Sequence, residues 1–210
     1  VQDEIAAAIT GALRTELIGA VSQETAETSI EVYDLYLVAR QKIYTRDIDE
    51  MKEASRLLDQ ALELDGEYAP ALAQKALVLV LMSDGVGSYG EIPAVEALAA
   101  ARLLVDRAIA IDASLAEAHA VSGLIMGGET GKSNDDEIAV LEHALSLNPN
   151  LDNTRNWLST AYGEASRNEE SRALLEAVVE RDPMFGPAFN NLIQSYLRTR
   201  DFDLGNALVG

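Results

Sequence analysis

The sequence contains no cysteine, which excludes disulfide bonds, thiolate nucleophiles and cysteine-ligated metals. It has only two histidines, and neither the H-E-x-x-H pattern of zinc peptidases nor the G-x-S-x-G pattern of serine hydrolases occurs. The longest apolar run, residues 76–82, is far too short to cross a bilayer. Carboxylates are abundant, but no two of them form a recognisable catalytic pair. We therefore expect no enzymatic activity, no cofactor and no membrane insertion of this chain.

Positive charge is scarce: 16 Lys and Arg stand against 35 Asp and Glu, a formal net charge of −19. Such a field repels phosphate backbones and anionic lipids, so we expect no binding to nucleic acid. A basic partner, or one reached through apolar and amide contacts, suits this charge. The chain begins at Val1 and shows no signal peptide. We expect it to be part of a longer protein, in the cytoplasm or, after a transmembrane segment elsewhere in that protein, in the periplasm.

What the sequence does have is a helix-favouring composition, 48% hydrophobic and rich in alanine and leucine, and an internal repeat. Four segments align: ALELDGEYAPA from Ala61, AIAIDASLAEA from Ala108, ALSLNPNLDNT from Ala144 and VVERDPMFGPA from Val178. They begin 47, 36 and 34 residues apart. Each ends an apolar helix, continues with Asp or Asn and a turn, and begins another helix. The repeat therefore predicts a series of helical hairpins.

The spacing of 34 residues and the residues inside each unit resemble the tetratricopeptide repeat (TPR), a helix–turn–helix unit. Leu158, Ser159 and Tyr162 give the large, small and aromatic series of a first TPR helix. Two further sets recur, small residues where paired helices approach and core residues on the second helices: Ala76, Gly123 and Ser159, and Leu58, Val105, Leu141 and Leu175. The resemblance implies an all-α fold, a right-handed α–α superhelix (TPR solenoid) of about four and a half helical hairpins.

An extra amphipathic helix is predicted before the repeats. Its apolar residues recur every four positions, at Ile5, Ile9, Leu13 and Leu17. The combination VQDEIAAAI … VYDLYLVARQ resembles a bacterial arrangement in which a TolB-like domain ends in such a helix and runs into TPRs, within transcriptional regulators and class III nucleotide cyclases. This resemblance assigns residues 1–31 to the N-terminal helix and linker at the end of a preceding domain, and residues 32–210 to the TPR array. We expect the apolar stripe to pack on the first repeat.

Two glycine-rich stretches invite a nucleotide-binding interpretation. GGETGKS at residues 127–133 ends like a phosphate-binding loop, and GVGSYG at residues 85–90 has the G-x-G-x-x-G spacing of dinucleotide sites. The Walker pattern needs glycine five residues before Gly131, where Met126 stands, and a helix rather than a strand is predicted before each stretch. We interpret both as turns within helical hairpins, the first over residues 127–134. A nucleotide-binding enzyme is therefore the least favoured function.

The two histidines are predicted to meet. His119 begins the first helix of the third hairpin and His143 lies near the end of its second helix, so an antiparallel arrangement brings them together. Two ligands make a poor metal site, and Glu117 and Glu142 are interpreted as solvent-facing. We expect a packed or hydrogen-bonded histidine pair and no metal.

The first helices of a TPR array line its concave groove. The repeat register places ten residues there: Tyr36, Arg40, Asn153, Asn156, Trp157, Thr160, Asn190, Asn191, Gln194 and Arg198. Amide side chains donate to and accept from an extended peptide backbone, and arginine suits a carboxylate. The set loosely resembles, without its lysines, the clamp with which some TPR proteins hold a C-terminal carboxylate. The alternative is that the amides lie on a hydrated helix face and that the tryptophan packs against its neighbour.

The sequence therefore predicts a protein–protein interaction scaffold that binds an unidentified peptide or partner domain in the groove, within a larger bacterial regulatory protein. The alternative is a segment that regulates a cyclase or transcriptional regulator through intramolecular contacts or self-association. Weak dimerisation through the chain ends is also expected. The second helix of the fifth hairpin breaks off at Gly210, which leaves Phe202, Leu204, Leu208 and Val209 without a following helix.

Overall fold

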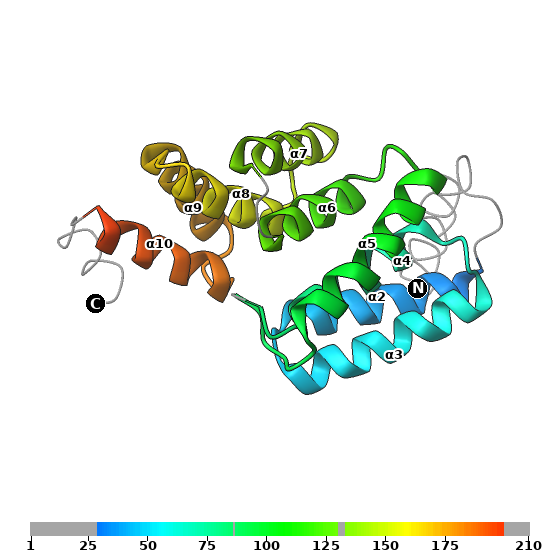
Figure 1. Cartoon of the computed structure of the whole chain (residues 1–210). Helices are drawn as coiled ribbons and strands as arrows, with labels where there is room; N and C mark the ends of the chain where they lie inside the picture. The colour runs from blue at the N-terminus through cyan, green and yellow to red at the C-terminus, as the bar shows by residue number, and fades with distance from the viewer. Residues whose placement is uncertain (1–28, 86, 130–132, 200–210) are drawn as a thin grey trace, which may run out of the picture.

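The computed structural model describes residues 29–85, 87–129 and 133–199. Within these ranges nine helices hold 78% of the residues and no strand forms, so the predicted all-α fold is confirmed. The helices form pairs that follow one another along a curve (Figure 1). Their bounds are α2 (Ile30–Tyr44), α3 (Ile48–Leu64), α4 (Ala69–Leu81), α5 (Ala94–Ile111), α6 (Ala116–Gly128), α7 (Asn134–Leu147), α8 (Asp152–Glu164), α9 (Asn168–Arg181) and α10 (Gly186–Arg198).

The four aligned repeat segments all end a helix in the same way. The residues after α3, α5, α7 and α9 have extended backbones, with φ between −140° and −135°, and they are Asp65, Asp112, Asn148 and Asp182. Each side-chain oxygen accepts a hydrogen bond from the backbone N–H two residues later, over 2.9–3.1 Å. This Asx turn redirects the chain into the next helix. The Asp or Asn of the repeat is therefore the residue that joins one hairpin to the next.

The hairpins stack by burying the residues that recur in the sequence. Leu58, Val105 and Leu141 on the second helices are completely buried, and Leu175 is 2% exposed. Within the third hairpin, a Cβ at Gly123 would lie 2.6 Å from Cδ2 of Leu141, so the close approach predicted at this small residue is confirmed. The first helices α2, α4, α6, α8 and α10 also contact one another in order, which continues the stack as a solenoid.

The α4–α5 loop contains the glycine-rich stretch of residues 85–90. A Cβ at Gly90 would lie 2.1 Å from the carbonyl oxygen of Met82, so only glycine allows the loop to fold against the end of α4. Asp84 then accepts a hydrogen bond from the backbone N–H of Ala94 over 2.7 Å, at the start of α5. As predicted, this stretch is a loop between paired helices.

The glycine-rich stretch of residues 127–133 differs from its prediction in one respect. Helix α6 continues through Gly127 and Gly128, and α7 begins at Asn134, so the turn is shorter than the predicted residues 127–134. Ser133 begins α7 by accepting a hydrogen bond from the backbone N–H of Asp135 over 3.2 Å. Gly131 and Lys132 lie outside the described residues, as do the predicted N-terminal helix and the second helix of the fifth hairpin.

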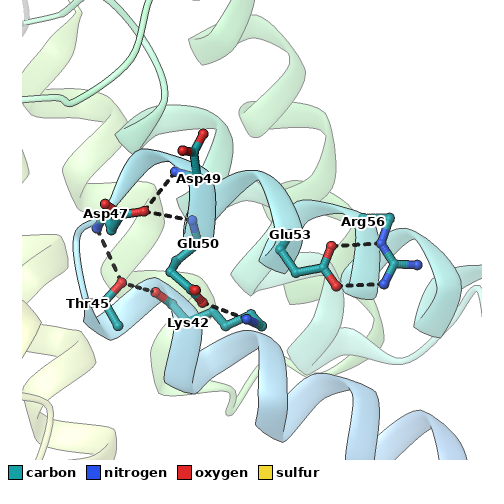
Figure 2. Close-up of polar contacts among 7 residues, drawn as sticks. All are labelled: Lys42, Thr45, Asp47, Asp49, Glu50, Glu53 and Arg56. Atoms are coloured by element: carbon teal, nitrogen blue, oxygen red, sulfur yellow. Dashed lines mark hydrogen bonds and ion pairs between the residues drawn. The ribbon is translucent and has the colours of Figure 1, made fainter.

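The turn of the first hairpin is held by the polar contacts in Figure 2. Thr45 donates a hydrogen bond to the carbonyl of Lys42 over 2.8 Å and accepts one from the backbone N–H of Asp47 over 3.2 Å. The Asp47 side chain in turn accepts from two backbone N–H groups in the first turn of α3. Lys42 and Glu50 form an ion pair of 2.6 Å between the two helices. This turn fixes the positions of Tyr44 and Arg46, whose side chains contact Phe185 before α10.

Candidate interaction groove

The inside of the curved array contains two cavities, of about 360 and 530 Å³. We call them the first cavity and the second cavity; Trp157 lines both. The first is formed mainly by α2, α4, α6 and α8, and the second by α6, α8 and α10 together with the α4–α5 loop. Both lie where the first helices of successive hairpins face one another.

The first cavity combines apolar side chains with a charged edge. Arg40 lies over the ring of Tyr36, with 5.6 Å between the guanidinium carbon and the ring centroid, and donates a hydrogen bond to its hydroxyl over 3.3 Å. Burial lowers the pKa of Arg40, while Tyr36 and Glu117 raise it, and the net shift is upward. The guanidinium therefore stays charged beside the apolar surface of Leu77 and Val121.

The two ends of the array meet beside the first cavity. Tyr44, the last residue of α2, donates a hydrogen bond to the carboxylate of Asp182, and its ring stacks on Phe185 with centroids 5.8 Å apart. Arg46 donates to the side-chain oxygen of Asn153 and lies over Phe185, 6.0 Å from the ring centroid. We call these five residues the clasp. In Figure 1 the turn between α2 and α3 accordingly lies beside the start of α10.

The backbone of Arg46 is in the left-handed region, with φ of 58°. Glycine is the usual residue in this conformation after a helix, and a side chain there costs about 1 kcal/mol. The guanidinium also donates to the carbonyl of Ile43 over 3.3 Å, and burial lowers the pKa of Arg46. The contacts of the long side chain in the clasp, which glycine cannot make, offset the backbone cost.

The second cavity is lined by amide and hydroxyl groups from α8 and α10. The amide of Asn191 donates to the side-chain oxygen of Asn156 over 2.9 Å, and Asn156 is 5% exposed. Thr160 donates to the backbone carbonyl of Asn156 over 3.2 Å. Both Thr160 and Asn190 are exposed. Donors and acceptors therefore border this cavity on two helices, with Trp157 beside them.

One carboxylate in the second cavity is buried. Glu137, in the first turn of α7, is 8% exposed. Burial and the nearby carboxylate of Glu164 raise the pKa of Glu137 to about 7. This side chain is therefore divided between its neutral and charged forms near neutral pH.

Seven of the ten predicted groove residues line a cavity: Arg40, Asn153, Asn156, Trp157, Thr160, Asn190 and Asn191. Tyr36 does not, because its ring packs edge-on against Tyr68 and leaves only 6% of the residue exposed. Gln194 and Arg198 are exposed on α10 but line neither cavity. A Cβ at Gly163 would lie 2.6 Å from the guanidinium of Arg198, so this arginine lies over the end of α8.

Sequence reasoning missed the cavity residues on α4 and α6. The register that places Asn153, Asn156, Trp157 and Thr160 in the groove also applies one repeat earlier. There it gives Glu117, Ala120, Val121 and Leu124, all of which line a cavity. The register therefore indicates these residues as well, but the set is mostly apolar and lacks the amide and arginine groups that suit a peptide backbone and a carboxylate. The clasp and Glu137 carried no comparable signal.

The two histidines meet as predicted. Their rings are edge-to-face with centroids 4.8 Å apart, and Nε2 of His119 lies 2.9 Å from the carbonyl oxygen of Ala113. The expected packed and hydrogen-bonded pair is therefore observed. In the part of the chain that the structure describes, no group of three or more side chains gathers that could hold a metal ion.

Comparisons with known proteins show which solved structures share this fold. No family model and no curated protein matches the chain. Among solved structures, TTC0263, a thermophilic TPR protein of Thermus thermophilus, gives a TM-score of 0.63 at 13% identity, over 83% of this chain and 87% of its own. This chain has the fold of a TPR solenoid.

Two other solved structures are also similar to this chain. PilF of Pseudomonas aeruginosa gives a TM-score of 0.56 at 15% identity, over 85% of this chain and 73% of its own. An O-GlcNAc transferase mutant of Thermobaculum terrenum gives 0.52 at 18% identity, over 76% of this chain but 28% of its own. At these identities the likeness extends to the fold alone. None of the solenoid's helices within the described ranges is long and apolar enough to span a bilayer.

Proposed function

We propose that this TPR solenoid is a non-enzymatic scaffold that binds an extended segment of a partner protein along the two cavities. The observation that carries the proposal is the second cavity, where exposed Thr160 and Asn190 lie with Trp157 in one lining. An extended backbone presents donors and acceptors, and amide and hydroxyl groups match both. The tryptophan ring offers apolar area for a side chain between them.

The first cavity adds a charged group to the same groove. Arg40 is exposed, and its guanidinium is available to a carboxylate of the segment, as a bidentate partner. Glu117, on α6, supplies the opposite charge in the same cavity. The groove thus offers amide contacts along the segment and, at one end, both a positive and a negative side chain. Because these charges select particular residues of the ligand, the groove favours a segment of defined sequence.

A peptide-display selection on the immobilised chain tests this proposal. We expect selected peptides to lose at least about tenfold in affinity, or about 1.4 kcal/mol, when Thr160 and Asn190 are both changed to alanine. The matched control is Gln60→Ala, an exposed amide on α3, outside both cavities. Calorimetric titration of the chain with each peptide measures the change. If no peptide is enriched, or if both variants lose the same affinity, a groove function is contradicted.

We further propose that the solenoid belongs to a larger bacterial regulatory protein, as the resemblance of its first forty residues to TolB-like and TPR regions suggests. The exposed apolar residues of α2 support a covered position for this helix in the whole protein. They include Ile30 at 59%, Tyr33 at 42% and Leu37 at 39% exposure. A preceding segment of the same chain or of a second copy is the occupant that this context supplies.

A further inference from the structure

The second cavity contains a buried carboxylate without a partner. Glu137 is 8% exposed, and within the described residues its carboxylate accepts no hydrogen bond and forms no ion pair. Buried carboxylates in proteins are normally paired or hydrogen-bonded, because an isolated one is costly to remove from water. The arrangement therefore suits a cationic group that the described residues do not supply.

The backbone of α6 leaves the space that this carboxylate occupies. A Cβ at Gly127 would lie 2.6 Å from Oε1 and 3.0 Å from Oε2 of Glu137, so both oxygens lie against the glycine. Glu137 and Gly127 both line the second cavity. The carboxylate is thus held at the wall of an open space rather than turned out to bulk water.

The charge around Glu137 is negative. Among the described residues, the charged group that shifts the pKa of Glu137 is Glu164, at the end of α8, and it shifts this pKa upward. The remaining titratable groups in the lining are Arg46 and Tyr89. The Arg46 guanidinium is already engaged by Asn153 and by a backbone carbonyl in its own turn. Within the described lining, a cation that enters the cavity therefore meets two carboxylates.

The walls suit a cation carried on an aliphatic stem. Leu98, Leu124 and Trp157 supply apolar surface, and Asn190 supplies an amide. Methylene groups of a long basic side chain bury readily along such surface while the charged head reaches a polar partner. A free divalent ion fits less well, since such ions prefer six or more oxygen ligands and no group of three metal-binding side chains gathers among the described residues.

We propose that the second cavity receives a lysine or arginine side chain of the partner segment and pairs its cationic head with Glu137. The proposal rests on the proposed function in one respect, that the groove binds a partner segment. It assigns the chemistry of one position in that segment, and it agrees with the net charge of −19, which favours a basic partner.

The pairing is linked to protonation. Glu137 must be ionised to hold the cation, and its pKa is about 7 in the free chain. Binding therefore displaces a proton at pH 6 and does so hardly at all at pH 8. With this pKa the affinity for the cation rises about tenfold between those two pH values.

Butylammonium is the probe, because it carries the head and stem of lysine without a peptide, and butanol is its neutral control. We expect butylammonium to bind the wild-type chain in the millimolar range and to shift the carboxyl carbon resonance of Glu137 by NMR, whereas butanol does not. Glu137→Gln keeps the shape of the side chain and should weaken binding at least about tenfold. Glu63→Gln, on an exposed residue of α3, makes the same charge change and should leave binding unaltered.

Two results overturn the proposal. One is a Glu137 resonance in the wild-type chain that butylammonium does not move, a readout that does not depend on any variant folding. The other is binding that persists in Glu137→Gln. Replacing lysine by norleucine in the display-selected peptides separates the two proposals. If the peptides bind equally well with norleucine and to the Glu137→Gln variant, the cation site is wrong but the scaffold proposal is supported. If butylammonium binds at Glu137 but no peptide is enriched, the cation site is supported and the scaffold proposal is wrong.

Discussion

Glu137 and Arg46 are two residues whose placement costs the folded chain free energy. Glu137 is a carboxylate buried beside another carboxylate, and Arg46 has a left-handed backbone that glycine adopts more easily. Both line the second cavity. Strained or desolvated groups concentrate at functional sites, so their presence in one cavity agrees with the proposed role of the groove.

Glu137 should make the stability of the chain depend on pH. Its folded-state pKa of about 7 lies above the value of about 4.3 in an unfolded chain, so the folded state holds its proton more tightly. The stability from this group is fully present below about pH 4.3 and is lost as pH rises through 7. Relative to Glu137→Gln, we expect the wild type to lose about 1–3 kcal/mol of unfolding free energy between pH 5 and pH 8.

Urea unfolding of both proteins at the two pH values measures this difference. Glu63→Gln serves again as the control, because it makes the same charge change at an exposed residue of α3 outside the second cavity. A wild-type profile parallel to that of Glu137→Gln would show that the buried carboxylate does not titrate in this range.

At the scale of elements, the helical hairpins were predictable because their signals are local. The Asp or Asn that ends α3, α5, α7 and α9 makes the same Asx turn in each repeat, and the sequence repeats it visibly. The buried Leu58 and the small Gly123 follow from the same register. The burial of Tyr36 did not, because it depends on Tyr68 in the next hairpin, and no local pattern reports which face of α2 that hairpin covers.

Two glycines should respond in opposite ways to alanine. A Cβ at Gly90 would meet the backbone carbonyl of Met82 at 2.1 Å, so Gly90→Ala should lower the unfolding free energy by about 1–3 kcal/mol. Gly186, the first residue of α10, has no heavy atom within 4 Å of its Cβ position. Gly186→Ala should therefore be neutral or stabilise by up to about 1 kcal/mol. Thermal unfolding by circular dichroism compares them, and equal melting temperatures would contradict the close packing of the loop.

The N-terminal segment should stabilise the first hairpin. The exposed apolar residues Ile30, Tyr33 and Leu37 on α2 need a cover, and the predicted stripe of Ile5 and Ile9 offers one. At about 25 cal/mol per Å² of buried apolar area, its removal should cost several kcal/mol. Urea unfolding and light scattering of the chain with and without residues 1–21 measure stability and self-association. A monomer that loses no stability on this deletion would contradict both expectations about the chain ends.

At the scale of the whole molecule, the resemblance to TPR proteins implies a curved array, but the repeat spacing does not predict how strongly it curves. Tyr44 and Asp182 are 138 residues apart, and they meet only because small rotations between successive hairpins add up around the curve. Repeat spacing defines each hairpin but not the rotation from one to the next, which depends on the exact side chains packed between them. The clasp and the division of the groove into two cavities therefore emerge only in three dimensions.

Removal of the clasp should open the array. Tyr44→Ala combined with Arg46→Gly deletes the contacts to Asp182, Asn153 and Phe185 while it keeps the backbone conformation of residue 46. Each lost contact contributes about 1 kcal/mol, so the open population should rise at least about tenfold. Because the chain has no cysteine, Lys52→Cys and Glu180→Cys give unique positions for fluorescent labels.

Single-molecule energy transfer between these labels should then decrease, in line with a larger distance between the end hairpins. Tyr33→Ala is the matched control, because it removes an aromatic ring from α2 that takes no part in the clasp. An unchanged transfer efficiency in the clasp variant would show that the stacking of the hairpins alone closes the curve.

The clasp also sets a threshold for entry. We expect a segment that occupies both cavities to bind best when the clasp is open, because Tyr44 and Phe185 line the first cavity. Its apparent dissociation constant is the intrinsic constant divided by the open fraction, and an array that is open about one-tenth of the time binds about tenfold more weakly than a permanently open one. Substitutions at the clasp should thus change the affinity through the open fraction as well as through direct contacts with the ligand.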